Sequence, residues 1–179
     1  MQEELSVVAK GKILIVDDTP ANINLLSDFL PDWGYEVESA NSGKAGLNSV
    51  EVCAPDVILL DIKMPDMDGY EVCQRLKANP KTQDIPVIFL SALDEVIDKV
   101  RAFEAGGVDY ITKPLQLQEV LVRIENQMSL QLAKAQICKL NAELEERVKQ
   151  RTVELELAVK KHLETQQQLE YMAYHDALT

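Results

Sequence analysis

The chain has 179 residues, 46% of them hydrophobic, and a formal net charge of −12. This length suits one domain of ordinary size with an extension, and the acidic excess argues against nucleic acid or an anionic membrane as a partner. No signal peptide precedes the first element, and no apolar run is long enough to cross a bilayer, so we expect a cytoplasmic protein. Its three cysteines lack metal-ligand spacing and are expected to be reduced: Cys53, Cys73 and Cys138.

Up to Pro114, short apolar runs alternate with segments of helical length. The runs predict strands at 12–16, 35–39, 56–60, 86–90 and 109–112. The segments between them predict helices at 20–31, 43–53, 68–78 and 94–105. Alternation of this kind is typical of βαβ crossovers, and continuous apolar runs indicate strands covered on both faces. We therefore predict an α/β fold with a five-stranded, doubly wound parallel sheet.

The sequence changes character after Pro114, because all seven glycines and all seven prolines lie at or before this residue. Apolar residues there first cover one face of a helix that would pack on the sheet: Leu117, Val120, Leu121, Ile124 and Met128. A second set, the seam, follows in steps of three and four: Leu130, Ala133, Ile137, Leu140, Leu144, Val148, Arg151, Leu155, Ala158, His162, Thr165, Leu169 and Met172. Two consecutive steps of four, from Leu140 to Val148, form a stutter that would locally unwind a supercoil.

A helix of about 55 residues would extend roughly 80 Å and would not be stable alone. We expect it to form a parallel dimeric coiled coil with a second copy of the chain. Arg151 at a seam position is costly in a dimer core and would make the local register sensitive to how the preceding domains pack. A helix that folds back on its own domain remains the alternative, although its polar faces are wide for a buried helix.

Polar side chains directly follow four of the predicted strands. Asp17 and Asp18 follow the first strand, Asp61 the third, Ser91 the fourth and Lys113 the fifth. Ligands of open α/β sheets bind outside the carboxyl ends of the strands, so these five side chains could converge. Three crowded carboxylates repel one another unless a cation joins them, and oxygen ligands favour Mg²⁺. Such a site suits phosphoryl transfer, the alternative being that each acid merely caps a helix.

The motifs ILIVDD, ILLDIKMPDMDG, FLSA and DYITKP resemble those of the response-regulator receiver domain of two-component signalling, a flavodoxin-like fold, over roughly residues 10–128. The resemblance implies that Asp61 accepts a phosphoryl group from a phosphohistidine of a sensor histidine kinase. It also implies that Asp18, Asp61 and the backbone carbonyl of Lys63 hold Mg²⁺, while Asp17 acts mainly through a metal-bound water.

The same resemblance assigns three further roles. Lys113 would pair with the phosphate and would precede a cis peptide bond to Pro114. Ser91 would swing inward to donate to a phosphoryl oxygen, and Tyr110 would follow into the vacated space. A hydroxyl and a ring that share one pocket have two discrete packings, so phosphate could bias one of them.

The segment LEERVKQRTVELELA resembles the signalling helix, a parallel dimeric coiled coil that links sensory to catalytic modules. The residues LEYMAYHDALT resemble the lead-in to a diguanylate cyclase (GGDEF) domain, which begins after an Asp-x-Leu-Thr turn, here Asp176, Leu178 and Thr179. No GG[DE]EF motif occurs in the chain. We expect no enzymatic activity in it beyond phosphorylation and dephosphorylation at Asp61, with a cyclase domain following.

The sequence thus predicts four parts: a tail at 1–10, a receiver at 11–128, a coiled-coil signalling helix at 129–174 and the start of an output domain at 175–179. Two copies would pair through the coiled coil and the receiver face 94–128. Phosphorylation of Asp61 would change how the two receivers pack, through the helix at 94–105, the strand at 109–112 and the helix after 115, and would rotate or shift the coiled coil. This change would control whether two cyclase domains meet to make cyclic di-GMP. Two other outputs stay open: a non-catalytic dimerisation module, and a receiver that feeds a histidine kinase.

Overall fold

The computed structural model describes residues 9–92 and 96–178 and divides the chain into two compact units, Met1–Leu130 and Gln131–Thr179. The first unit holds one parallel sheet with strand order β2-β1-β3-β4-β5. Its strands are β1 (Gly11–Val16), β2 (Tyr35–Ala40), β3 (Val57–Asp61), β4 (Val87–Ser91) and β5 (Asp109–Thr112). The predicted fold class is confirmed, and every predicted strand end lies within one residue of the observed end.

The helices are α1 (Pro20–Phe29), α2 (Gly43–Cys53), α3 (Gly69–Ala78), α4 (Val96–Glu104) and α5 (Leu117–Ala177). The first helix ends earlier than the predicted residue 31, because Pro31 cannot donate a backbone hydrogen bond. The chain continues there as a 3₁₀ helix, η1 (Leu30–Trp33), and stops at Gly34, whose φ of +88° favours glycine. The predicted start of the fourth helix, at residue 94, lies outside the described residues.

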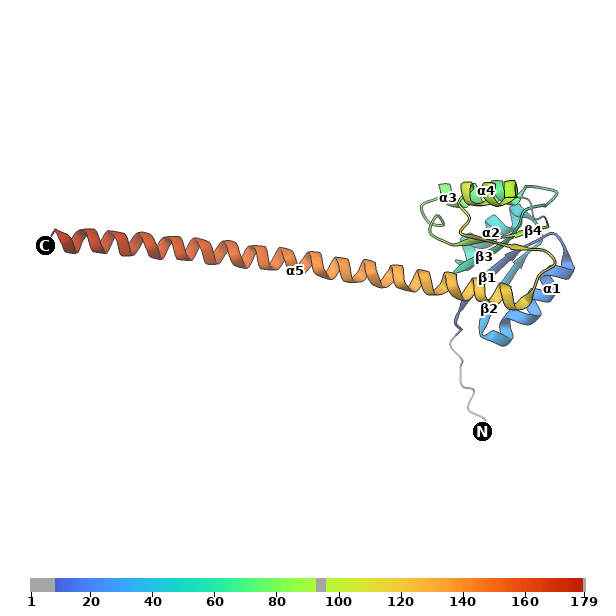
Figure 1. Ribbon diagram of the computed structural model, residues 1–179, viewed down its shortest axis with the longest axis horizontal. Coiled ribbons are helices and arrows are strands. Elements are labelled where there is room, and N and C mark those ends of the chain that lie inside the picture. The colour runs from blue at the N-terminus through green and yellow to red at the C-terminus, as the bar shows by residue number, and fades with distance from the viewer. Residues whose placement is uncertain (1–8, 93–95, 179) are drawn as a thin grey trace, which may run out of the picture. The chain divides into compact units, whose positions relative to one another are not determined.

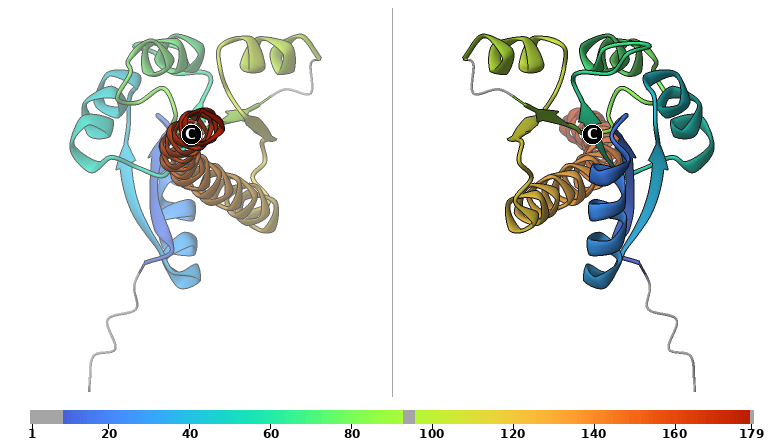
Figure 2. Two further views of the ribbon diagram at one scale, coloured as in Figure 1. Left: turned by 90° about the vertical axis from the view of Figure 1, so that its left-hand side faces the viewer. Right: turned by 90° about the vertical axis from the view of Figure 1, so that its right-hand side faces the viewer.

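The sheet is covered by helices on both faces, as Figures 1 and 2 show. Neighbouring residues of a strand point to opposite faces, so each strand supplies two cores. Leu14, Leu60 and Phe89 face a core completed by α2, α3 and α4. Ile15 and Leu90 face the other core, which α1 and α5 complete. Most of the Leu, Ile, Val and Phe side chains in the two cores are fully buried, and each of these contributes roughly 1.5–3 kcal/mol.

The last helix, α5, begins as predicted on the sheet. Val120, Leu121 and Ile124 are buried there, and Leu117 and Met128 pack at the edge of the same core. The helix continues without a break to Ala177, and every residue from 132 to 178 is exposed. The predicted seam is therefore a row of uncovered side chains in the single chain. No helix in the described residues is both long and apolar enough to span a membrane.

The start of α3 lies unusually close to the end of β3. The backbone N–H of Gly69 donates to the carbonyl of Ile62 at 2.9 Å. A Cβ atom at Gly69 would overlap the carbonyl oxygen of Asp61 and would lie 3.0 Å from Cα of Ile62. Both neighbours are backbone atoms, which cannot rotate away, so this approach requires glycine.

We predict that Gly69→Ala lowers the free energy of unfolding by about 2 kcal/mol or more, because the new methyl group must push the β3 end and α3 apart. Urea denaturation followed by circular dichroism measures the change. Gln74→Ala is the control, since Gln74 is exposed on the same helix and its replacement should change stability by less than about 0.5 kcal/mol. Equal losses in the two variants would contradict the proposed steric cause.

Candidate functional site

The carboxyl ends of two neighbouring strands, β1 and β3, bring three acids together. Asp17 and Asp18 directly follow β1, and Asp61 ends β3, which pairs with β1. One carboxylate oxygen from each of the three lies within 4.8 Å of the others. Asp17 is 0% exposed and Asp61 only 4%, so two of the three charges are largely removed from water. The structure thus places the three predicted acids in one cluster.

Lys113 reaches this cluster from the end of the edge strand β5. It directly follows β5, and its Nζ lies 2.9 Å from Oδ2 of Asp17 and 2.9 Å from Oδ1 of Asp61. Its backbone N–H donates to the carbonyl of Ser91 at 2.6 Å, and the predicted cis peptide bond to Pro114 is confirmed. The ammonium group therefore bridges two acids that would otherwise repel each other.

The charges of the cluster shift two pKa values. Burial raises the pKa of Asp61 above its ordinary value, the hydrogen bond and charge of Lys113 act against this, and the charges of Asp17 and Asp18 add to it. Burial alone would lower the pKa of Lys113, but hydrogen bonds and charges from Asp17 and Asp61 outweigh burial and raise it. One ammonium group thus only partly offsets three carboxylates. An oxygen-only set of ligands with excess negative charge fits a hard divalent cation such as Mg²⁺.

Two partners from α1 and the turn before it hold Asp17. The backbone N–H of Thr19 donates to Oδ1 of Asp17 at 2.8 Å. The side-chain amide of Asn22 donates from Nδ2 to Oδ2 at 2.9 Å. Sequence reasoning missed Asn22. The only available signal was an amide residue in the first turn of the helix that follows the acidic pair.

The loop after Asp61, residues 62–68, is fixed at two points that the sequence did not reveal. The carboxylate of Asp66 accepts hydrogen bonds from the backbone N–H groups of Lys44, at 3.0 Å, and Gly43, at 3.2 Å, where α2 begins. These bonds, that from Lys44 foremost, lower the pKa of Asp66. The carboxylate of Asp68 caps α3 by accepting from Glu71 N–H at 2.8 Å. The loop that carries Lys63 is therefore held between two helix starts.

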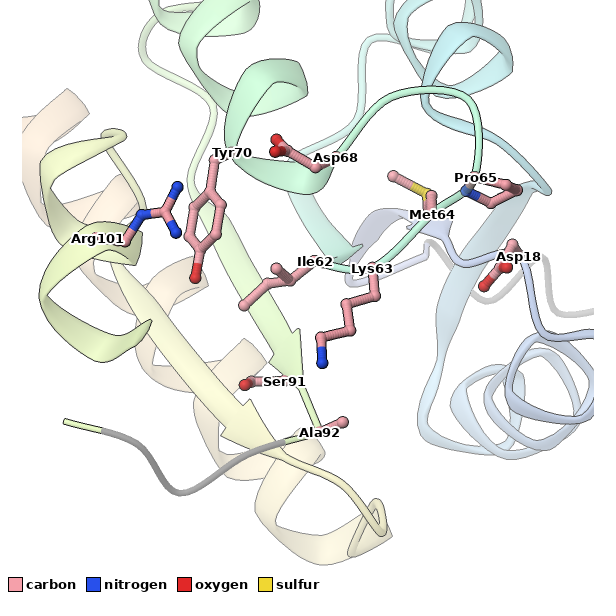
Figure 3. A pocket seen from close by; sticks show the side chains of 10 residues that line it. All are labelled: Asp18, Ile62, Lys63, Met64, Pro65, Asp68, Tyr70, Ser91, Ala92 and Arg101. Carbon is pink, nitrogen blue, oxygen red and sulfur yellow. The ribbon is translucent and has the colours of Figure 1, made fainter. Parts of the chain in front are cut away.

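The predicted pair Ser91 and Tyr110 occupies two different places. Ser91 ends β4, is 6% exposed, and lines a pocket of about 480 Å³ together with Asp18 and Lys63 (Figure 3). Tyr110 lies on β5, opposite Phe89 of β4, and its half-buried ring meets the edge of Phe103 on α4 at 6.2 Å between centroids. Ser91 thus lies in the pocket, whereas Tyr110 packs on α4.

An aromatic residue that the sequence did not single out, Tyr70, lines the pocket that contains Ser91. The guanidinium group of Arg101, on α4, stands over the ring of Tyr70, on α3, at 4.7 Å (Figure 3). Such a cation–π contact contributes about 0.5–2 kcal/mol. It links α3 and α4 through two residues that line the same pocket as Ser91.

Comparison with known proteins identifies similar chains. Residues 13–125 match the family described as response regulator receiver domain. The chain is 43% identical over 113 residues to the DNA-binding dual master transcriptional regulator RpaA of Synechocystis, covering 63% of this chain and 47% of that protein. It is 40% identical over 144 residues to a protein of Vibrio cholerae named probable cyclic di-GMP phosphodiesterase, covering 80% of this chain and 32% of that protein. The chain thus spans less than half the length of either relative.

Solved structures show the same arrangement. A CheY-like response regulator receiver domain protein from Methanospirillum hungatei superimposes with a TM-score of 0.64 at 30% identity. The similarity covers 69% of this chain and 97% of that one. It therefore concerns the sheet and its helices rather than the whole length of α5.

We predict that Asp61→Asn raises the free energy of unfolding of the metal-free protein by on the order of 1 kcal/mol, because it removes one of three mutually repelling carboxylates. Excess Mg²⁺ should stabilise the wild-type protein by binding only the folded state, and should stabilise the variant much less. Urea unfolding in EDTA and in excess Mg²⁺ measures both effects.

The matched control is Asp28→Asn, which neutralises an exposed acid on α1 and should leave the gain from Mg²⁺ unchanged. An equal gain from Mg²⁺ in wild type and Asp61→Asn would exclude Asp61 from the cation site.

Proposed function

The chain belongs to the response regulator receiver family, whose members take phosphoryl groups from histidine kinases, and we propose that Asp61 is the residue that accepts this group. The observation that carries the proposal is the Lys113 ammonium, 2.9 Å from both Asp17 and Asp61. A cation that bridges the acceptor and a neighbouring acid can move to an incoming phosphoryl oxygen. Lysine suits this exchange, because its ammonium group is a compact charge on a flexible stem.

Transfer forms a bond between a carboxylate oxygen of Asp61 and phosphorus. The bond between phosphorus and the imidazole nitrogen of the kinase breaks, and its electron pair leaves with the histidine. Asp18, Asp61 and the carbonyl of Lys63 would hold Mg²⁺, while Asp17 would act mainly through a metal-bound water. Mg²⁺, when bound, neutralises charge on the transferring oxygens. The fixed loop around Asp66 and Asp68 supports this assignment, because it restrains the backbone at Lys63.

After transfer, Lys113 pairs with a phosphoryl oxygen, and the Ser91 hydroxyl turns to donate to another. The position of Ser91 in the pocket, next in sequence to Leu90, which pairs with Asp61, supports this role. Tyr110 then leaves its contact with Phe103 and moves toward the space that Ser91 has left. Two packings of one ring provide the discrete switch.

A salt bridge offers a route from this switch to α5. The carboxylate of Asp109 accepts from the backbone N–H of Tyr110 at 2.9 Å. Both of its oxygens also accept from Nη1 of Arg123 on α5, at 3.0 and 2.9 Å. Oε1 of Glu119, also on α5, lies 3.3 Å from Nη2 of Arg123. A shift of β5 at Tyr110 would therefore be passed to α5 through Asp109 and Arg123.

The next step of the proposal is a parallel dimer. The exposed row of apolar seam residues on α5 would form a coiled coil with a second copy, in the manner of a signalling helix. The receiver face 94–128 would add to the interface, because Val100, Phe103 and Val122 are each at least half exposed there. Phosphorylation would then change the packing of two receivers and shift the register of the coil.

For the output we propose a diguanylate cyclase domain that follows residue 179. The support is the sequence LEYMAYHDALT, which resembles the lead-in to such domains. A cyclic di-GMP phosphodiesterase domain is the second candidate, because the relative with that name is similar over 144 residues, beyond the receiver itself. Sequencing the gene past codon 179 distinguishes the two.

We predict that Asp61→Asn abolishes labelling by a radioactive small-molecule phosphodonor, because the amide oxygen is not a competent nucleophile. Wild-type protein should be labelled in Mg²⁺ and should lose labelling in EDTA. Asp28→Asn, the exposed-acid control, should be labelled like the wild type. Retained labelling of Asp61→Asn would move the acceptor elsewhere.

We predict that a cysteine at a seam position cross-links two copies. In a Cys53→Ser, Cys138→Ser background, Leu140→Cys should form a disulfide dimer under mild oxidation, because facing seam residues approach within disulfide range. Lys139→Cys, the neighbouring position outside the seam, should cross-link far less. Gel electrophoresis without reductant measures both yields, and equal yields would contradict the proposed seam.

The same assay tests the route to α5. Adding the phosphodonor should change the cross-linking rate of Leu140→Cys. In a Leu140→Cys protein that also carries Arg123→Ala, the phosphodonor should no longer change the cross-linking rate, although Asp61 should still be phosphorylated. A phosphodonor response that survives Arg123→Ala would contradict the route through Asp109.

A further inference from the structure

The neutral side chain of Asn22 donates a hydrogen bond to one of the carboxylates of the site. Asn22 lies in the first turn of α1, and its Nδ2 donates to Oδ2 of Asp17 at 2.9 Å. The same oxygen accepts from Lys113 Nζ at 2.9 Å. Oδ1 accepts from the backbone N–H of Thr19 at 2.8 Å. Three donors thus share one fully buried carboxylate, two of them from the turn that begins α1 and one from the residue after β5.

We propose that Asn22 is a positioning residue that keeps the Asp17 carboxylate in place for Mg²⁺ binding while Lys113 changes partners. The inference rests on the proposed function, because it assumes that Lys113 turns to the phosphoryl group on Asp61. When the ammonium makes this move, Oδ2 of Asp17 loses one of its two donors. The Asn22 amide, which takes no part in the exchange, remains.

The surroundings of Asp17 make this second donor necessary. Asp17 is 0% exposed, so bulk water cannot readily replace a lost partner. A buried carboxylate with too few hydrogen bonds is costly, and it relieves that cost by turning toward another donor. Such a turn would weaken the contribution of Asp17 to the cation site. A donor that stays in place prevents it.

The backbone around Asn22 is well fixed for this task. Pro20 begins α1, and its ring presets the helical φ angle. The backbone N–H groups of Asn22 and Ile23 both donate to the carbonyl of Thr19, at 3.1 and 3.3 Å. Thr19 in turn donates its own N–H to Asp17. One short turn therefore binds both oxygens of the carboxylate, one through backbone and one through the Asn22 side chain.

The chemistry of the side chain matters as much as its place. An amide donates without carrying charge, so it holds Asp17 without competing with a cation for the site. A second lysine here would offset the charge that attracts Mg²⁺. An aspartate would add a fourth repelling carboxylate, and an alanine would leave Oδ2 with Lys113 alone. Residues that orient the ligands of a metal commonly change its affinity by 10–100-fold when replaced.

The test compares two asparagines of one helix. Asn24 is exposed two residues further along α1, so Asn24→Ala is the matched control for Asn22→Ala. We expect Asn22→Ala to bind Mg²⁺ about tenfold more weakly in a calorimetric titration, and Asn24→Ala to bind it like the wild type. Unchanged Mg²⁺ affinity in Asn22→Ala, or an equal loss in Asn24→Ala, would overturn the proposal.

Phosphorylation kinetics separate positioning from a general loss of structure. With a small phosphodonor, Asn22→Ala should need about tenfold more Mg²⁺ for half-maximal rate and should approach the wild-type rate at saturating Mg²⁺. Asn22→Gln keeps the amide on a longer stem and should recover part of the affinity. A glutamine variant as weak as the alanine variant would overturn the role of the amide. The calorimetric titration measures the effect of Asn22 on Mg²⁺ affinity, whereas labelling of Asp61→Asn tests the phosphoacceptor. The two proposals can therefore fail separately.

Discussion

The bridge from Lys113 to Asp17 and Asp61 is the interaction on which the rest of the structure depends. Two carboxylates at the ends of β1 and β3 are almost completely buried, and such charges persist in a protein interior only when they are paired. The pairing cation comes from the end of β5, which lies beyond β4 in the sheet. The salt bridge therefore ties the edge of the sheet to its centre. A change of charge at Asp61 therefore acts directly on this link between the edge and the centre of the sheet.

The chain sequence predicted the parts of the site that depend on local pattern. Strands ended where apolar runs met Asp17, Asp61, Ser91 and Lys113, because continuous hydrophobic runs and Pro or Gly punctuation are visible over a few residues. The shared carboxyl edge then followed from parallel topology. Asn22 escaped notice because an amide in a first helical turn is ordinary in sequence.

The restraints on the loop after β3 could not be predicted from the sequence, for a different reason. The contact of Asp66 with the start of α2 joins residues more than 20 positions apart. Which helix start approaches which loop is decided by packing, as is the overlap that makes Gly69 necessary beside Asp61. Roles at the site that depend on such packing, including the separate places of Ser91 and Tyr110, could be read only from the folded chain.

The exposed leucines of α5 have a consequence for how the protein behaves at different abundances. From residue 132 to 178 every residue of the chain is exposed, and isolated helices in water are marginal. Its stability must come from whatever covers that row of side chains. With a second copy as the cover, folding and association become one event, and the stability of this region rises with protein concentration. The amount of protein that a cell makes would then set how much of it is dimeric, and so how much can respond to phosphorylation.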